Sequence, residues 1–180
     1  MSNSVYLTSR LFNDTAMMFR RALAKELSSR NIKVIEDNSF PLKRIFRSRK
    51  NCGIAIAIDF FDDGKEGSGI KLNKGCTTIS RDFAYTISNE LDKIAPQLRW
   101  RDFEFISAID KNWRNYFHNV GGEVKVIFYL CTINNEEDFD IFSTHFNDMV
   151  KVFADEIVRC IRSNYKSLVY QKKLRTKLRK

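Results

Sequence analysis

Residues 52–61, CGIAIAIDFF, are the stretch that decides the fold of this chain. The run is rich in isoleucine and almost wholly apolar, with one carboxylate, Asp59, near its end, and the acidic, glycine-containing segment DDGKEGSG follows it. An unbroken apolar run with turn residues behind it predicts a central strand that is buried on both faces. Because parallel sheets carry their binding chemistry at the carboxyl ends of such strands, a functional site is expected at Asp59.

Length and composition indicate one domain with a substantial core, since 43% of the 180 residues are hydrophobic. The chain has no apolar run of about 18 residues and no basic-then-apolar leader, so we expect no membrane span, no signal peptide and synthesis in the cytoplasm. The four cysteines are scattered, without a CxxC pair or a His/Cys cluster. This spacing favours reduced, mostly buried thiols over a disulfide framework or a zinc ribbon.

The positive charge is concentrated at the carboxyl end of the chain. Seven of the nine net positive charges come from residues 166–180, which contain no acid, and this leaves +2 for residues 1–165. We therefore expect an α/β domain over 1–165 and a basic tail or helix extension over 166–180. The basic residues of this tail are Lys166, Lys172, Lys173, Arg175, Lys177, Arg179 and Lys180. A nearly neutral body is not typical of a domain built around a nucleic-acid groove.

Strand-like and helix-like segments alternate along the chain. The expected strands are 5–7, 32–35, 52–61, 70–72 and 124–131. The expected helices begin at Asn13 or Asp14, at Pro41, at Thr77 or Thr78, and near Phe146. In the third helix the apolar stripe is Ile79, Phe83, Ile87, Leu91 and Ile94, whereas 97–122 forms an irregular connection and 132–142 an acidic turn. This alternation predicts an α/β fold with a single, mostly parallel sheet flanked by helices on both faces.

Three segments, in this order, resemble the zinc-dependent N-acetylmuramoyl-L-alanine amidases, which cut the bond between sugar lactate and stem peptide in the bacterial cell wall. The first is RIFRSRKNCGIAIAIDFF at 44–61, and the second is GSGIKL at 67–72 with TTISRDFAYTISNEL at 77–91. The third is VKVIFYLCTINNEEDFDIF at 124–142 followed by FNDMVKVFADEIVRCIRSNY at 146–165. Together they cover most of residues 40–165, so the resemblance implies the amidase fold for this part of the chain.

The resemblance also implies where catalytic residues would stand. Family members hold zinc with a histidine and a glutamate in a glycine-rich loop after the first strand and with a histidine that ends the central strand, and a glutamate on the last strand is the general base. Here the first loop, TSRLFND, contains neither histidine nor glutamate. Asp59 occupies the position of the central-strand histidine, and Tyr129 that of the last-strand glutamate. We therefore expect a degenerate member, a pseudoenzyme with no catalytic residue, cofactor or metal.

Other candidate sites have a structural interpretation beside the functional one. Asp59 with the acidic loop from Asp62 to Glu66 could attract a hard cation, or the loop could simply be solvated. Cys131 could be a nucleophile if a histidine, His118 or His145, lay beside it. An aromatic and basic connection could bind sugars, bases or protein subunits, or pack onto the sheet; its residues are Trp100, Arg101, Trp113 and Arg114.

Three functions remain open at this point. The first is an inactive, amidase-like binding or structural component of a larger assembly, such as a virus particle or a cell-wall-associated complex. Its partners would be other protein subunits, reached through the aromatic connection and the basic tail, with cell-wall glycan as a further candidate. The second is a divergent peptidoglycan hydrolase with a remodelled metal site. The third is a nucleic-acid-binding accessory protein that works through its tail.

Overall fold

The computed structural model describes residues 4–10, 13–37, 52–63, 65–73, 76–106 and 122–177, with the course of the backbone alone for 101–106 and 164–177. The strands are β1 (Ser4–Ser9), β2 (Lys33–Asp37), β3 (Ile54–Phe61), β4 (Ser68–Asn73), β5 (Trp100–Ile106) and β6 (Val124–Thr132). The helices are α1 (Asp14–Ser29), α3 (Thr78–Ile94), α5 (Glu136–Thr144) and α6 (Phe146–Lys177).

The strands form one mixed sheet in the order β2-β1-β3-β6-β4-β5. Strands β2, β1, β3 and β6 are parallel to one another, β4 is antiparallel to β6, and β5 is parallel to β4. The apolar stretch at 52–61 forms β3, which lies between β1 and β6, and all eight of its residues are buried. The prediction of an α/β fold with a mostly parallel sheet flanked by helices is therefore confirmed, but the described helices all contribute to the core on one face of the sheet, whereas helices on both faces were expected.

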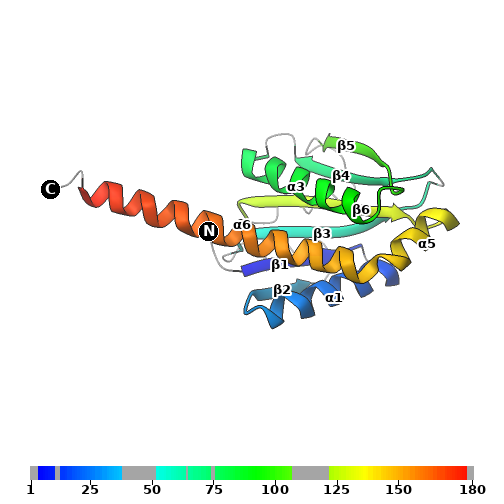
Figure 1. Ribbon diagram of the computed structural model, residues 1–180, viewed down its shortest axis with the longest axis horizontal. Helices are drawn as coiled ribbons and strands as arrows, with labels where there is room; N and C mark the ends of the chain where they lie inside the picture. Colours follow the sequence, from blue (N-terminus) through cyan, green and yellow to red (C-terminus); the bar gives the residue numbers. More distant parts are fainter. Residues whose placement is uncertain are drawn as a thin grey trace.

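The main core lies between the sheet and helices α1, α3 and α6, which run across it in Figure 1. Alternate residues of β3 face this layer, and they are Ile54, Ile56, Ile58 and Phe60. Phenylalanine rings join the helices to the sheet: the ring of Phe153 on α6 lies 4.8 Å from Phe128 on β6 and 5.5 Å from Phe19 on α1, centroid to centroid. The final helix thus joins both halves of the helical layer to the central strands.

The opposite face of the sheet is also buried and carries a second, smaller apolar cluster. It contains Tyr6 from β1, Ala55, Ala57 and Phe61 from β3, and Ile127 and Tyr129 from β6. Because successive residues of a strand point to opposite faces, this second cluster follows directly from the alternation along β3. The short helix expected from Pro41 lies outside the described residues.

Side-chain caps begin two helices where the sequence indicated alternatives. The Asn13 side chain accepts a hydrogen bond from the Ala16 backbone N–H at 2.9 Å, so Asn13 rather than Asp14 is the cap of α1. Thr77 caps α3 in the same way, accepting from the Ser80 N–H at 3.1 Å. The Thr77 hydroxyl also donates to the Glu123 carbonyl at 3.0 Å, and this bond ties the start of α3 to the segment before β6.

Two elements replace segments that the sequence analysis interpreted as irregular. Residues 100–106 form β5, which pairs with β4 at the edge of the sheet, instead of belonging to an irregular connection. The acidic turn after β6 contains helix α5, whose cap Asn135 accepts from the Asp138 N–H at 3.0 Å. Three acids in the first turn of α5 favour this helix, because negative charge there is stabilised by the helix dipole.

Helix α6 is the longest element, with 32 residues. Its first half packs on the sheet through Met149, Phe153, Ala154 and Ile157. Its second half continues without a break through Lys177 and extends beyond the end of the sheet in Figure 1. Much of the basic segment 166–180 is therefore a helical continuation of α6. Within the described part of the chain, no helix is long and apolar enough to cross a membrane.

Truncating the ring at the centre of the helical layer should destabilise the whole fold. We expect Phe153→Ala to lower the free energy of unfolding by about 3–5 kcal/mol, because the lost ring leaves a cavity among Phe19, Phe128 and α6. Denaturant unfolding followed by circular dichroism measures this. The control is Met18→Ala on α1, where the side chain is 56% exposed and the change should stay within about 0.5 kcal/mol. Equal effects of the two variants would contradict this account of the core.

Candidate functional site

Asp59 and Tyr129 are neighbours in the structure. Strands β3 and β6 pair in parallel with Asp59 opposite Tyr129, and both side chains are fully buried. Their flanking residues Ile58 and Phe128 face the helices, so Asp59 and Tyr129 point to the opposite face of the sheet. Parallel pairing therefore brings together two positions that are 70 residues apart in the sequence and that the resemblance to amidases assigns to zinc binding and base catalysis.

The surroundings of this pair are aromatic and cationic. The ring of Phe61 stacks on Tyr129, with centroids 4.4 Å apart and planes inclined by 14°. The ammonium group of Lys71 on β4 lies 5.3 Å from the centroid of the Tyr129 ring, a distance typical of a cation–π contact. Lys71 is itself only 8% exposed. A carboxylate, a phenol, a phenyl ring and a buried cation thus occupy this part of the sheet.

The segment after β1 lies beside the end of β3, where the resemblance places the first metal ligands. The Arg10 N–H donates to the Ile58 carbonyl at 3.3 Å, and the Arg10 guanidinium forms an ion pair with Asp62 at 3.1 Å. Nearby, the Tyr6 hydroxyl donates to the Asp37 carboxylate at 3.1 Å. The described residues at this edge of β1 therefore supply an arginine and hydrogen-bonded polar groups.

The described residues do not fit a zinc centre of the amidase type. A hydrolytic zinc site needs about three protein ligands, an open position and a base beside the bound water. Asp59 and Tyr129 supply one carboxylate between them, and the ammonium group of Lys71 lies near the Tyr129 ring, where its charge would oppose a metal cation. Nowhere in the described ranges do three or more His, Cys, Asp or Glu side chains gather in a group that could hold a metal.

The acidic loop after β3 is held by hydrogen bonds to the protein. Asp62 is paired with Arg10, and the Asp63 side chain accepts from the Lys65 N–H at 3.2 Å. Side chains of Asp62, Asp63 and Glu66 are exposed. The Asp62–Arg10 pair is itself largely exposed, so it contributes little to stability. This geometry favours the solvated-loop interpretation over the cation-binding one.

A residue that the sequence analysis did not single out, Asp138, fastens this loop to the sheet. Its Oδ2 atom accepts from the Gly67 N–H at 2.7 Å and from the Thr132 N–H at 3.2 Å, and Asp138 is only 3% exposed. The Thr132 hydroxyl adds a hydrogen bond to the Lys65 carbonyl. The sequence does contain a signal for this residue: Asn135 and Asp138 are spaced like the cap of a helix and the third residue of that helix.

The remaining predicted site residues that the structure describes belong to elements other than β3. Trp100 is half-buried at the start of β5, where it packs against the main core, and Arg101 follows it in the same strand. Trp113, Arg114 and His118 lie outside the described residues. His145 ends α5, its N–H donating to the Ile141 carbonyl at 3.1 Å. The tail residues Lys172, Lys173, Arg175 and Lys177 belong to α6, and Arg179 and Lys180 lie outside the described residues.

Cys131 has the properties of a core thiol. It is fully buried in the main core, and burial, with a smaller contribution from the Asp138 carboxylate, raises its pKa. Burial likewise raises the pKa of Cys52 to about 11. Both thiols are therefore protonated near neutral pH, which makes them poor nucleophiles because the thiolate is the reactive form.

Removing the Asp138 carboxylate should loosen the loop at the end of β3. We expect Asp138→Ala to lower the free energy of unfolding by at least about 2 kcal/mol, because two buried N–H groups, those of Gly67 and Thr132, lose their acceptor. The matched control is Asp140→Ala on the same helix, where the side chain is exposed. Denaturant titration of both variants gives the comparison, and equal stabilities would argue against the fastening role.

Thiol labelling should separate buried from partly exposed cysteines. At about pH 8 a brief exposure of the native protein to iodoacetamide should leave Cys52 and Cys131 unmodified, whereas Cys76 and Cys160 react. Because the pKa of Cys52 lies near 11, raising the pH toward that value should increase its labelling. Peptide mass spectrometry reads out each site, with the denatured protein as the fully labelled control. Fast native labelling of Cys131 would contradict its assignment as a core thiol.

Comparison with known proteins identifies the fold at the level of structure. The chain matches no protein-family model and no curated protein by sequence. Among solved structures, it is similar to AmiC2, an N-acetylmuramoyl-L-alanine amidase of Nostoc punctiforme, with a TM-score of 0.67, 10% identity and coverage of 89% of this chain and 98% of that one. The corresponding amidase from Clostridium difficile 630 gives a TM-score of 0.63 and 14% identity over 91% and 97% of the two chains.

A third structure, from Neisseria meningitidis and described as an amidase of the same kind, gives a TM-score of 0.67 and 19% identity over 87% and 94% of the chains. In each case the match covers most of this chain and nearly the whole of the solved one. At these identities the likeness concerns the fold. The chain has the fold of the N-acetylmuramoyl-L-alanine amidases.

Proposed function

We propose that this chain is a catalytically inactive amidase-fold domain that acts as a binding or structural component of a larger assembly. The observation that carries the proposal is the pairing of Asp59 with Tyr129 on the two central strands, at the positions that the resemblance assigns to a zinc ligand and the general base. A domain that loses its catalytic residues can keep its fold and its binding surface, because activity depends on the site residues and not on the fold alone.

The chemistry of the pair supports the loss of catalysis. A tyrosine hydroxyl, with a pKa near 10, is a poor general base at neutral pH. The Phe61 ring covers one face of Tyr129, and the Lys71 ammonium lies near its ring. An amidase needs a metal and an activated water beside its base, whereas the neighbours of Tyr129 include an aromatic ring and an ammonium group, which supports the loss of catalysis.

The proposed binding role rests on the fold and on the placement of charge. Proteins of this fold act on cell-wall peptidoglycan, so an inactive copy would suit a virus particle or a cell-wall-associated complex in which the domain contacts glycan or neighbouring subunits. The helical continuation of α6 carries the basic segment beyond the sheet, where it is available to another molecule (Figure 1). The main alternative is a divergent hydrolase in which Asp59 works with a remodelled metal site.

Metal content and amide cleavage, measured together on the full chain, test the proposal. We expect far less than one zinc ion per chain by elemental mass spectrometry, even after incubation with zinc and gel filtration, because the described donors do not form a zinc site. We also expect no release of new L-alanine amino groups from purified peptidoglycan above the buffer blank. An active amidase of the same fold, assayed in parallel, shows that substrate and conditions are adequate.

The variant Asp59→Asn separates the proposal from its main alternative. For an inactive domain, wild type and variant give the same blank-level signal. Cleavage by the wild type that disappears in Asp59→Asn and in a chelator would establish the divergent hydrolase and overturn the proposal. Stoichiometric zinc without cleavage would contradict the loss of the metal site while leaving a binding role open.

A further inference from the structure

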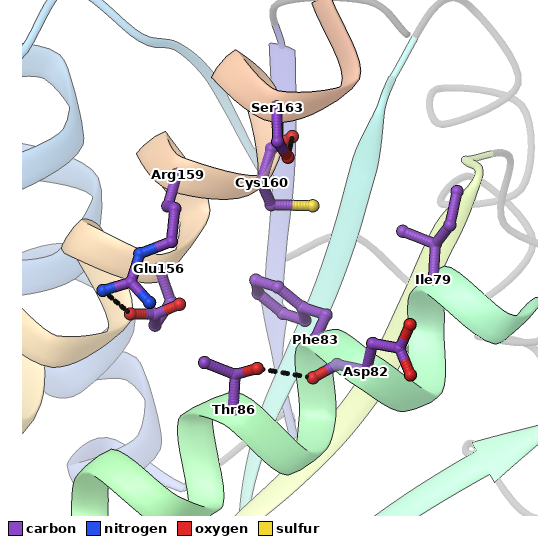
Figure 2. A pocket seen from close by; sticks show the side chains of 8 residues that line it. All are labelled: Ile79, Asp82, Phe83, Thr86, Glu156, Arg159, Cys160 and Ser163. Atoms are coloured by element: carbon purple, nitrogen blue, oxygen red, sulfur yellow. Dashed lines mark hydrogen bonds and ion pairs between the residues drawn. The ribbon is translucent and has the colours of Figure 1, made fainter. Parts of the chain in front are cut away.

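A cleft lies between α3 and α6, on the helical layer and away from Asp59. Its volume is about 310 Å³, and Figure 2 shows its walls. Helix α3 contributes Ile79, Asp82, Phe83 and Thr86, and α6 contributes Glu156, Arg159, Cys160 and Ser163. The sequence analysis placed Ile79 on the buried stripe of α3, but its side chain is 37% exposed at the rim of this cleft. An apolar side chain in that position is available to a partner.

The cleft combines apolar surface with net negative charge. Asp82 and Glu156 supply two carboxylates against the single guanidinium of Arg159. Glu156 is only 4% exposed and forms an ion pair, at 2.9 Å, with Arg159, which is 66% exposed. Burial raises the pKa of Glu156, and the nearby Glu90 and Asp155 carboxylates add to this effect against Arg159 and Lys93. The carboxylates of Asp82 and Glu156 outnumber the one guanidinium that lines the cleft, and this charge balance favours a further cation there.

The complementary segment is on the same chain, at the far end of α6. Residues 164–177, NYKSLVYQKKLRTK, mix apolar and basic residues and contain no acid. As a helix they span about 20 Å. A single helix of this length is marginal in water without packing, and its like charges repel one another. The composition of this segment is therefore complementary to a surface that is apolar and negatively charged.

We propose that the cleft between α3 and α6 receives the basic extension of α6, residues 164–177, from a second copy of the chain. The chain's own extension cannot reach it, because Ser163 lines the cleft and α6 continues from there as an unbroken helix. Two copies related by a two-fold axis would lay their α6 helices antiparallel. Each copy then gives its extension and receives the other, which closes the assembly at a dimer.

This inference rests on the binding role in the proposed function, and it names the partner as a second copy of the chain. Its tests measure the mass of the assembly and the proximity of two residues, whereas the tests of the proposed function measure zinc content and amide cleavage. A dimer that cleaves peptidoglycan would overturn only the proposed inactivity, and an inactive monomer would overturn only the dimer.

Sedimentation equilibrium of the full chain, freed of nucleic acid, tests the association. We expect a monomer–dimer equilibrium whose dissociation constant rises at least about tenfold in Ile79→Lys, because the lysine removes an apolar contact and its ammonium group repels the basic extension. The matched control is Met18→Lys on α1, an exposed methionine outside the cleft, which should dimerise like the wild type. Circular dichroism verifies that both variants are folded.

Cross-linking between two different chains tests the placement. One chain keeps Cys160 in the cleft, and the other carries Cys160→Ser with Ser167→Cys in the extension, so a short bismaleimide can join positions 160 and 167 only between chains. Peptide mass spectrometry should find this link. The control chain carries Cys160→Ser with Met18→Cys on α1, and it should give no link to Cys160.

A wild type that stays monomeric across the concentration range would overturn the proposal, including the case in which it assembles only when nucleic acid is added. So would a dimer that Ile79→Lys and Met18→Lys affect equally, or one in which Cys160 links to position 18 as readily as to position 167. A weakened Ile79→Lys dimer together with the 160–167 link supports it.

Discussion

The burial of β3 on both faces, between parallel neighbours, is the constraint on which the rest of the structure depends. Its isoleucines face the helical layer, and its alanines, Asp59 and Phe61 face the opposite side. Because side chains alternate along a strand, a shift of one residue in register would exchange these two sets and place Asp59 under α6. A carboxylate among phenylalanine rings would be strongly disfavoured, so the hydrophobic pattern of this one strand fixes its pairing with β1 and β6.

The same register determines the chemistry at the carboxyl edge of the sheet. It sets Asp59 beside Tyr129, and the antiparallel strand β4 then brings Lys71 over the tyrosine ring. The fold therefore brings together the two positions that the resemblance assigns to catalysis, and Phe61 and Lys71 lie against the Tyr129 ring there. Likeness of fold at 10–19% identity is compatible with this, because backbone packing tolerates substitutions that a metal site does not.

Helix α6 connects this core to the charge distribution of the molecule. Its first half packs against Phe19 and Phe128 through Phe153, and its second half carries positive charge beyond the sheet. A rigid helix that is anchored at one end presents its other end in a defined direction. The acidic cleft beside α3 lies along the anchored half of α6, and the basic extension is the other half of the same helix. Because the helix is unbroken, the extension cannot fold back onto the cleft of its own chain.

The sequence by itself determined the central strand, the starts of α1 and α3 to within one residue, the mostly parallel sheet and the segregation of positive charge at the carboxyl end, because each depends on local periodicity or composition. It did not reveal β5 or α5: one is stabilised by pairing with β4, and the other lies in a segment whose acids were read as a turn. Only the tertiary structure decided that Asp59 lies beside Tyr129 and that Lys71 lies near the Tyr129 ring. It also decided that Asp138 binds the backbone of Gly67, 71 residues earlier in the chain, and that Ile79 lines a cleft with α6. These relations join distant parts of the chain, and the pairing of strands and helices creates them.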